Sequence, residues 1–182
     1  MWDLISADKS EAHRHHDDYL SSLGPASEQL RNRFKAETGA DLDGSIESLI
    51  ELKRWFVERL LTIEAPRAGL PAWWDPAMPT ADNGDPETYP FTRAQLMLVD
   101  EVQAYLAEVI LNANPGATWI VNRKSKRRLD SQLSMISAAD GRLLSPQNAA
   151  YEVSLKVVLR GEFVPDNLLA DYAGQGAEGA HR

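Results

Sequence analysis

The stretch FTRAQLMLVDEVQAYLAEVILNANPG, residues 91–116, decides the fold of this chain. Its Thr92 and Gln95 are spaced as in a capping box, and Phe91 stands before the cap, as in a hydrophobic staple. Apolar residues then recur at helical spacing for about five turns until a Pro-Gly pair interrupts the pattern. The stretch therefore predicts a helix over residues 92–113 at the centre of the molecule.

Three further helices are predicted nearer the N-terminus. The first covers residues 9–22 and ends at Gly24-Pro25, because proline lacks the backbone donor that a helix interior needs. The second is short, with Ser27 as its cap and Gly39 as its end. The third, residues 45–63, has one broad apolar face opposite a charged face, which is typical of a helix that packs on a core.

Residues 65–90 have a different character, with six of the ten prolines of the chain. Proline fixes φ and removes donors, so a long loop without regular structure is predicted. The loop also carries four oxygen-bearing side chains that calcium could accept: Asp82, Asn83, Asp85 and Glu87. Their order lacks the spacing of an EF-hand loop, and the sequence favours Asx turns between prolines instead.

A β-hairpin is predicted over residues 118–137, because two runs of β-forming residues flank a polar stretch. Its tip carries five cationic side chains, namely Arg123, Lys124, Lys126, Arg127 and Arg128. Arg142-Leu-Leu144 can add a short third strand. Ser145 and Pro146 then begin a helix over residues 146–160, and one or two helical turns are expected within residues 166–172.

These patterns predict an α+β fold, in which a helical layer packs on a small antiparallel sheet of two or three strands. We expect one domain over residues 1–173 and a disordered tail over residues 174–182, since the tail has little to pack. In chain order, the parts of the domain are the N-terminal helices 9–63, the proline-rich loop 65–90, the helix 92–113, the hairpin 118–137 and the helix 146–160.

The composition is that of an acidic globular protein. The 182 residues include 43% hydrophobic and 25% charged residues, with a formal net charge of -8, so a substantial core is expected. Cysteine is absent, no run approaches the length of about 18 apolar residues that suggests a membrane span, and the first residues are acidic. We therefore expect a cytoplasmic protein with no disulfide and no membrane contact.

The charge pattern restricts the class of partner. Phosphate binding requires a field of Lys and Arg side chains, whereas this chain has 27 acidic against 19 basic residues. Its body should repel a polyanion, and only the basic tip could contact a nucleic acid. The tip has a second interpretation as a solvated turn that prevents edge-to-edge pairing of the sheet.

Trp73 and Trp74 are adjacent in the proline-rich loop, and in an extended segment they would point in different directions. One would then fill the core and the other would lie on the surface, where large aromatic side chains anchor protein partners. The alternative is that both hold the loop against the core. The first interpretation makes the two tryptophans, together with the basic tip, the candidate partner-binding residues.

Two acidic residues of the central helix are candidates for acid or base chemistry. Glu101 and Glu108 are two helical turns apart, and burial could raise a carboxyl pKa there. No nucleophile, catalytic motif or phosphate-binding loop accompanies them, so the sequence favours ion pairs with Arg or a contact with Tyr on neighbouring elements, and no catalytic residue is assigned.

The first predicted helix contains a group that resembles metal ligands, formed by His13, His15 and His16 with Asp17 and Asp18. His13 and Asp17 are one helical turn apart and could share an ion, but a site needs a third or fourth ligand. His16 falls on the apolar stripe of the helix, which favours a half-buried packing role. No metal site and no cofactor are predicted.

The order of several landmarks resembles an uncharacterised family of actinobacterial cytoplasmic proteins. They run from residue 38 to residue 172 and comprise Leu42-Asp43, Ser45, Glu47-Ser48-Leu49, Trp55, Trp73-Trp74-Asp75-Pro76, Tyr105, Glu108, Trp119 and the helix at Pro146. The resemblance implies one compact domain and no particular activity.

Three functions remain open on the sequence alone. The favoured one is a non-enzymatic protein-binding module, of the immunity or adaptor type, since an acidic protein suits a basic partner. The second is an accessory protein that contacts nucleic acid through the hairpin tip. The third is a hydrolase or transferase that uses Glu101 or Glu108.

Overall fold

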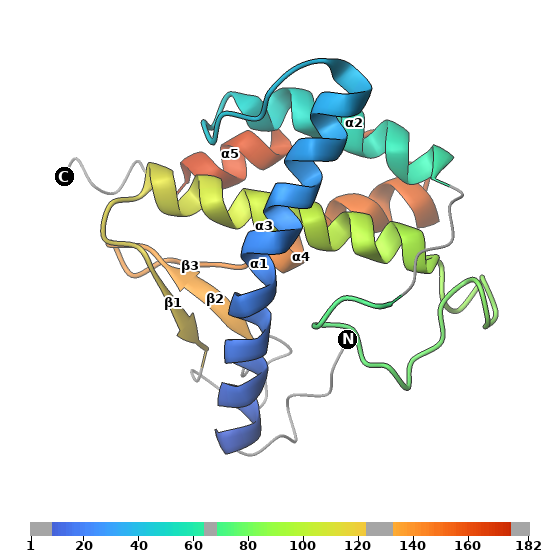
Figure 1. The fold of residues 1–182 in the computed structure, drawn as a ribbon, viewed down its shortest axis with the longest axis horizontal. Coiled ribbons are helices and arrows are strands. Elements are labelled where there is room, and N and C mark those ends of the chain that lie inside the picture. The colour runs from blue at the N-terminus through green and yellow to red at the C-terminus, as the bar shows by residue number, and fades with distance from the viewer. Residues whose placement is uncertain (1–8, 64–68, 123–132, 176–182) are drawn as a thin grey trace.

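The protein has an α+β fold with helices packed beside a small antiparallel sheet, as the sequence predicts (Figure 1). The computed structural model describes residues 9–63, 69–122 and 133–175. In the described residues the helices are α1 (Lys9–Thr38), α2 (Ser48–Thr62), α3 (Arg93–Ala113), α4 (Pro146–Ser154) and α5 (Leu168–Gly174), with a π-helical segment η1 (Leu155–Leu159) directly after α4. The strands are β1 (Thr118–Val121), β2 (Ser134–Ser137) and β3 (Leu143–Leu144).

Helix α3 lies at the centre, and α1, α2, α4 and α5 all pack against it (Figure 1). The predicted capping box is confirmed: Thr92 Oγ1 accepts the Gln95 backbone N–H at 3.2 Å, and Gln95 Oε1 accepts the Thr92 N–H at 2.8 Å. The Gln95 amide also donates to the Leu60 carbonyl at 2.9 Å. The cap thus fixes the start of α3 and joins it to α2.

The predicted break at Gly24-Pro25 is wrong, because α1 continues through Pro25 as one helix. Tyr19 before the proline and Leu30 after it are both buried in the core, and α1 packs along α3. This burial outweighs the missing N–H of Pro25 and its clash with the preceding turn. Ser27 accordingly does not cap a new helix; its hydroxyl donates to Glu108 Oε2 at 2.9 Å.

Replacing Pro25 with alanine is expected to stabilise the fold. Interior proline costs about 3 kcal/mol relative to alanine, and the more flexible unfolded chain of the variant offsets part of that gain. We expect the free energy of unfolding to rise by about 1–2 kcal/mol, measured by urea denaturation. Gly24→Ala is the matched control, with a gain of about 0.5–1 kcal/mol, since an added Cβ meets nothing within 4 Å. A loss of stability in Pro25→Ala would show that α1 needs the proline.

The sheet has the order β1-β2-β3, and both pairs are antiparallel. Thr118 lies opposite Ser137 and Val121 opposite Ser134, so the two strands of the predicted hairpin are confirmed. The third strand is also confirmed, although it has only two residues. The five cations of the predicted tip lie outside the described residues.

The C-terminal part follows the prediction with one correction. Pro146 occupies the first turn of α4, and Ser145 Oγ accepts the Asn148 N–H at 3.2 Å. The predicted helix 146–160 is α4 followed by η1. Gly174 belongs to α5, so the predicted tail begins too early, and residues 176–182 lie outside the described part. Between residues 69 and 90 the chain forms turns without helix or strand, as expected for the loop.

Candidate functional site

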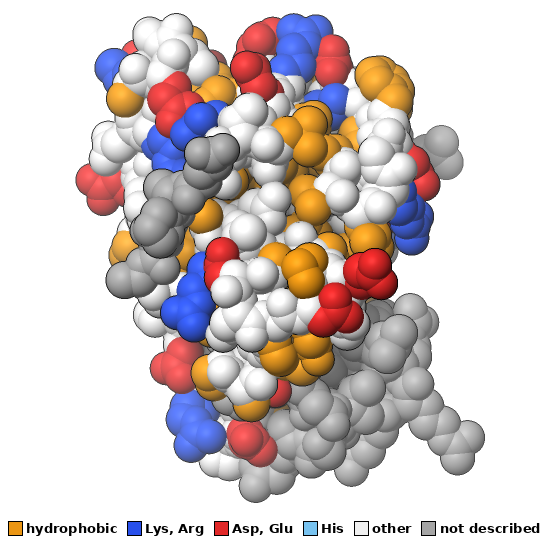
Figure 2. Space-filling view, turned by 90° about the vertical axis from the view of Figure 1, so that its right-hand side faces the viewer, with side chains coloured by type: hydrophobic (Ala, Val, Ile, Leu, Met, Phe, Trp, Pro, Cys, Tyr) orange, Lys and Arg blue, Asp and Glu red, His pale blue; other side chains and the backbone are white. Residues whose placement is uncertain are grey.

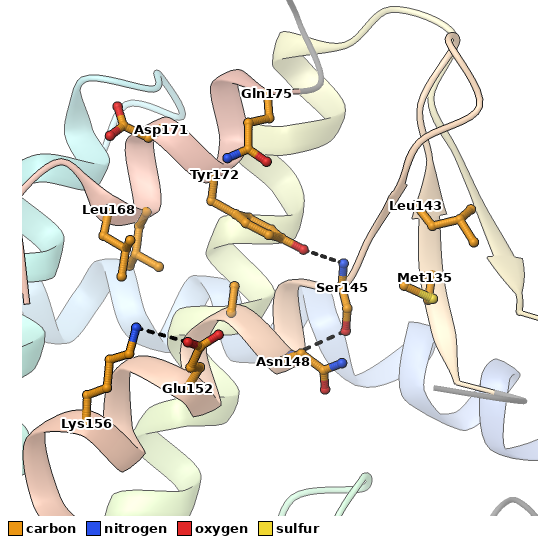
Figure 3. A pocket seen from close by; sticks show the side chains of 12 residues that line it. Met135, Leu143, Ser145, Asn148, Glu152, Lys156, Leu168, Asp171, Tyr172 and Gln175 are labelled. Atoms are coloured by element: carbon orange, nitrogen blue, oxygen red, sulfur yellow. Dashed lines mark hydrogen bonds and ion pairs between the residues drawn. The ribbon is translucent and has the colours of Figure 1, made fainter. Parts of the chain in front are cut away.

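A pocket of about 420 Å³ lies between the β3 side of the sheet, α4 and α5 (Figure 3). Its lining combines the apolar side chains of Met135, Leu143, Ala149, Leu168 and Leu169 with polar and charged side chains. Because side chains alternate along a strand, Met135 and Leu143 lie on the sheet face opposite the buried core residues Ile136 and Leu144. The volume lies within the range of about 300–1,000 Å³ that is usual for ligand pockets.

Tyr172 crosses the middle of this pocket and joins its two helices (Figure 3). Its hydroxyl accepts the Ser145 backbone N–H at 2.6 Å, and Ser145 in turn caps α4. Burial raises the pKa of the Tyr172 hydroxyl, so Tyr172 stays neutral at physiological pH. The hydroxyl hydrogen remains free to donate, since no acceptor for it occurs among the described residues.

Three charged side chains line the pocket, with Glu152 and Lys156 on the α4 side and Asp171 apart from them on α5 (Figure 3). Lys156 Nζ lies 2.9 Å from Glu152 Oε1, one helical turn away, and Asp171 Oδ2 accepts the Asn167 amide at 2.6 Å. Asn148 contributes an uncharged side chain near Ser145.

Trp73 and Trp74 are both buried, at 6% and 7% exposed, so the prediction that one of them lies on the surface is wrong. Trp73 Nε1 donates to Asp100 Oδ1 at 2.7 Å, and the two indoles meet edge to face with centroids 5.9 Å apart. The loop turns between them rather than running extended, since Trp74 N–H donates to the Pro71 carbonyl at 2.9 Å. Both tryptophans therefore hold the loop against the core, which confirms the alternative interpretation; their role in partner binding stays a prediction.

Glu108 forms the ion pair that the sequence favours. Arg31 donates to both of its oxygens, from Nη2 to Oε1 at 2.5 Å and from Nη1 to Oε2 at 2.8 Å. Hydrogen bonds from Arg31 hold the pKa of Glu108 below its ordinary value. A smaller pocket of about 290 Å³ borders Glu108, but a carboxylate held ionised in this way is unsuited to act as a general acid at neutral pH.

Glu101 is paired as well, with Arg33 Nη2 at 2.9 Å from its Oε1. Its side chain is fully buried. The two candidate carboxylates of α3 thus have structural partners on α1. The catalytic interpretation gains no support from their geometry.

His16 has the half-buried packing role that its position on the apolar stripe predicts. Its Nδ1 lies 2.9 Å from Ser134 Oγ on β2, and burial lowers its pKa. Among the described residues, no group of three or more His, Cys, Asp and Glu side chains is placed to hold a metal ion. In the proline-rich loop, Asp85 Oδ1 accepts the Glu87 N–H at 3.1 Å, which confirms an Asx turn at this position.

Sequence reasoning missed two features. Asp100 and Gln103 interrupt an otherwise apolar stretch, and this pattern could have indicated the buried network in which Tyr19 and Trp73 also take part. The second missed feature is the pocket: Asn148, Glu152 and Lys156 are four residues apart and share a helix face, but this spacing is equally typical of a solvent-exposed face. The other wall of the pocket, supplied by the sheet and α5, has no local sequence signal.

Within the described ranges, no helix combines the length and the apolar character needed to cross a membrane. The resemblance to an actinobacterial family remains a prediction. Comparisons with protein-family models, with curated proteins and with solved structures found no match to this chain.

Proposed function

We propose that this chain is a non-enzymatic protein-binding module of the adaptor or immunity type, acting in the cytoplasm. The observation that carries the proposal is the exposure of Phe163, which is 84% accessible and lies between η1 and α5. Leu159, at the end of η1, is 52% exposed. Large apolar side chains in such positions are typical anchors of protein interfaces.

The backbone around Phe163 is held by α2. The Lys53 ammonium donates to the Val164 carbonyl and lies 3.0 Å from Asp166 Oδ1, so it ties the segment that follows η1 to α2. The same ammonium lies 5.5 Å from the centre of the Phe163 ring, a cation–π distance. The Phe163 ring is thus exposed to solvent, while the backbone next to it is held in place by α2.

Hydrophobic side chains also reach the surface on the side of the molecule shown in Figure 2, where charged side chains border them. In the described residues, Leu61 at 65% and Met78 at 37% complete the set of large exposed hydrophobics. A surface that combines apolar side chains with a charged border resembles the core and rim of a protein interface.

The charge of the body supports a basic partner. The described residues include 22 of the 27 acidic side chains but only 12 of the 19 basic ones. Opposite fields raise the rate of encounter and suppress acidic competitors. The enzyme hypothesis is weaker because Arg31 and Arg33 hold its two candidate carboxylates in ion pairs.

The experiment is affinity capture from a cytoplasmic extract with the full chain as bait, followed by size-exclusion chromatography of the complex. Phe163→Ser should lose a stoichiometric partner. Removal of an aromatic side chain that becomes buried in an interface typically costs about 2 kcal/mol or more of binding free energy. Met78→Ser, which also removes an exposed apolar side chain, is the matched control and should retain the partner. Equal capture by both variants, or no stoichiometric partner for the wild type, would contradict the proposal.

A further inference from the structure

The outer edge of the sheet beside the pocket has free backbone groups. Ala138 N–H donates to the Arg142 carbonyl at 2.9 Å, which makes this a hydrogen-bonded pair of the β2–β3 ladder. Such pairs alternate with non-bonded pairs along an antiparallel ladder. The Ile136–Leu144 pair is therefore bonded, whereas the Ser137–Leu143 pair between them is not. The N–H and C=O of Leu143 consequently point away from β2.

The β1–β2 ladder independently gives the same alternation of hydrogen-bonded and non-bonded pairs along β2. Asn122 N–H donates to the Leu133 carbonyl at 2.9 Å, so Met135 and Ser137 direct their backbone groups toward β1. Ile136, between them, must then direct its groups toward β3. Both ladders thus place the Leu143 backbone groups at the open edge of the sheet.

Ser145, two residues further along this edge, also directs its N–H outward, and Tyr172 accepts that N–H at 2.6 Å. α5 therefore covers the end of the edge. The described residues supply no hydrogen-bond partner for the Leu143 N–H and C=O, and β3 is the last strand in the sheet order. Because Leu143 also lines the pocket, the open edge and the pocket form one continuous surface.

We propose that this surface binds an extended segment of a partner protein, which adds a strand to β3 through the backbone of Leu143. An apolar side chain of the segment enters the pocket against Met135 and Leu168, and a basic side chain two residues away reaches one of the lining carboxylates, Glu152 or Asp171. Strand addition supplies the main-chain hydrogen bonds, and the pocket supplies the specificity. This inference rests on the proposed function, because it names the chemistry of the partner.

The uncharged groups of the pocket match a peptide backbone. Asn148 and Gln175 contribute side-chain amides, for which no partner occurs among the described residues, and the Tyr172 hydroxyl can still donate a hydrogen. Amides and hydroxyls pair with the C=O and N–H of a peptide without the desolvation that a bare charge would suffer.

The charged residues of the pocket lining favour a basic side chain. The lining contains two carboxylates, Glu152 and Asp171, and one ammonium, Lys156. The Glu152 side chain is 67% exposed, and Asp171 has one oxygen that accepts no hydrogen bond from a described residue. The excess negative charge attracts Arg or Lys and repels an acidic residue.

The test uses the full chain labelled with ¹⁵N and the acetylated, amidated peptide Thr-Leu-Thr-Arg-Thr, in which the Leu and Arg side chains share one face. Two backbone hydrogen bonds and one filled pocket suggest a dissociation constant on the order of 0.1–1 mM. At saturation the amide of Leu143 should shift in the spectrum, and its hydrogen exchange should slow by about tenfold, because the bound strand then accepts its N–H.

Three matched controls separate the parts of the proposal. Replacing Arg of the peptide by Glu, or the charges of the pocket in the double variant Glu152→Gln/Asp171→Asn, should weaken binding by about fivefold to tenfold. Methylation of the peptide nitrogens that face β3 should abolish the protection of Leu143, because the methyl groups remove the donors to the Leu143 carbonyl and hold the two backbones too far apart for the peptide to accept the Leu143 N–H. Equal affinity for the Arg and Glu peptides, no binding at 5 mM peptide (about five times the weakest constant expected), or binding that leaves the Leu143 amide unchanged would overturn the inference.

Failure of this inference is distinguishable from failure of the proposed function. If affinity capture yields a partner that is lost in Phe163→Ser, and the peptide does not bind, the protein-binding function stands and the strand-addition mode is wrong. If the peptide binds as described and no partner is captured, the pocket assignment stands and the surface around Phe163 is not the docking site.

Discussion

Replacing Arg33 with alanine is expected to lower the free energy of unfolding by about 3–5 kcal/mol, the largest effect that we predict for a single substitution. The side chain of Glu101 has 0% exposure and that of Arg33 only 12%, with 2.9 Å between Nη2 and Oε1. Without the guanidinium, the Glu101 carboxylate keeps its charge in a medium of low dielectric constant or must take up a proton. Urea denaturation followed by circular dichroism measures the loss.

The control for this prediction is Arg59→Ala. Arg59 Nε lies 3.2 Å from Glu37 Oε2, and these two side chains are 34% and 33% exposed, so solvent screens the pair. A screened pair contributes about 0–1 kcal/mol. The double variant Arg33→Leu/Glu101→Leu should recover most of the stability, since it removes both charges of this buried pair. A loss in Arg33→Ala no larger than that in Arg59→Ala would contradict the expectation.

The second prediction is that Asp100→Asn raises the free energy of unfolding at pH 7.5 by about 1–3 kcal/mol, according to the rule that one pKa unit corresponds to 1.36 kcal/mol. Burial raises the pKa of Asp100 to about 6 from its ordinary value of 3.8. Trp73 Nε1 and Gln103 Nε2, each 2.7 Å from Asp100 Oδ1, offset only part of the desolvation. An asparagine oxygen can accept the same two hydrogen bonds without a buried charge.

The pH dependence of this difference gives the prediction its test. Because the pKa is higher in the folded than in the unfolded state, the folded protein binds more protons between pH 3.8 and about 6, and the wild type loses stability as the pH rises through this window. Asp100→Asn has no such loss. The stability difference between variant and wild type should therefore be small near pH 4 and reach its full value by pH 7. A difference that does not change with pH would mean that Asp100 does not titrate in the fold.

The elements that the sequence predicted well are those whose signals are local. Thr92 and Gln95 specify the start of α3, and both residues of that cap lie within one helical turn. Ser145 and Pro146 specify the start of α4 in the same way. The strands β1 and β2 follow from β-forming residues on both sides of one polar stretch, so their pairing needs no distant information.

The predictions that failed depended on distant contacts. Proline in α1 is unfavourable locally, and only the packing of α1 along α3 explains why the helix continues. Trp73 has no local feature that requires burial, and its position depends on Asp100, which is 27 residues away in the sequence. The pocket likewise needs β3, α4 and α5 together, so no single stretch of the sequence could indicate it.

The sequence by itself determined the class of the fold, the places where α3 and α4 begin, the antiparallel hairpin and the excess of acid, because each of these follows from residue types over short spans or from composition. Only the tertiary structure decided that α1 is continuous, that both tryptophans are buried, that Arg31 and Arg33 pair with Glu108 and Glu101, and that the Leu143 edge opens on a pocket. The physical reason is that burial and charge pairing are fixed by the partners that folding brings together, and these partners lie far apart in the chain.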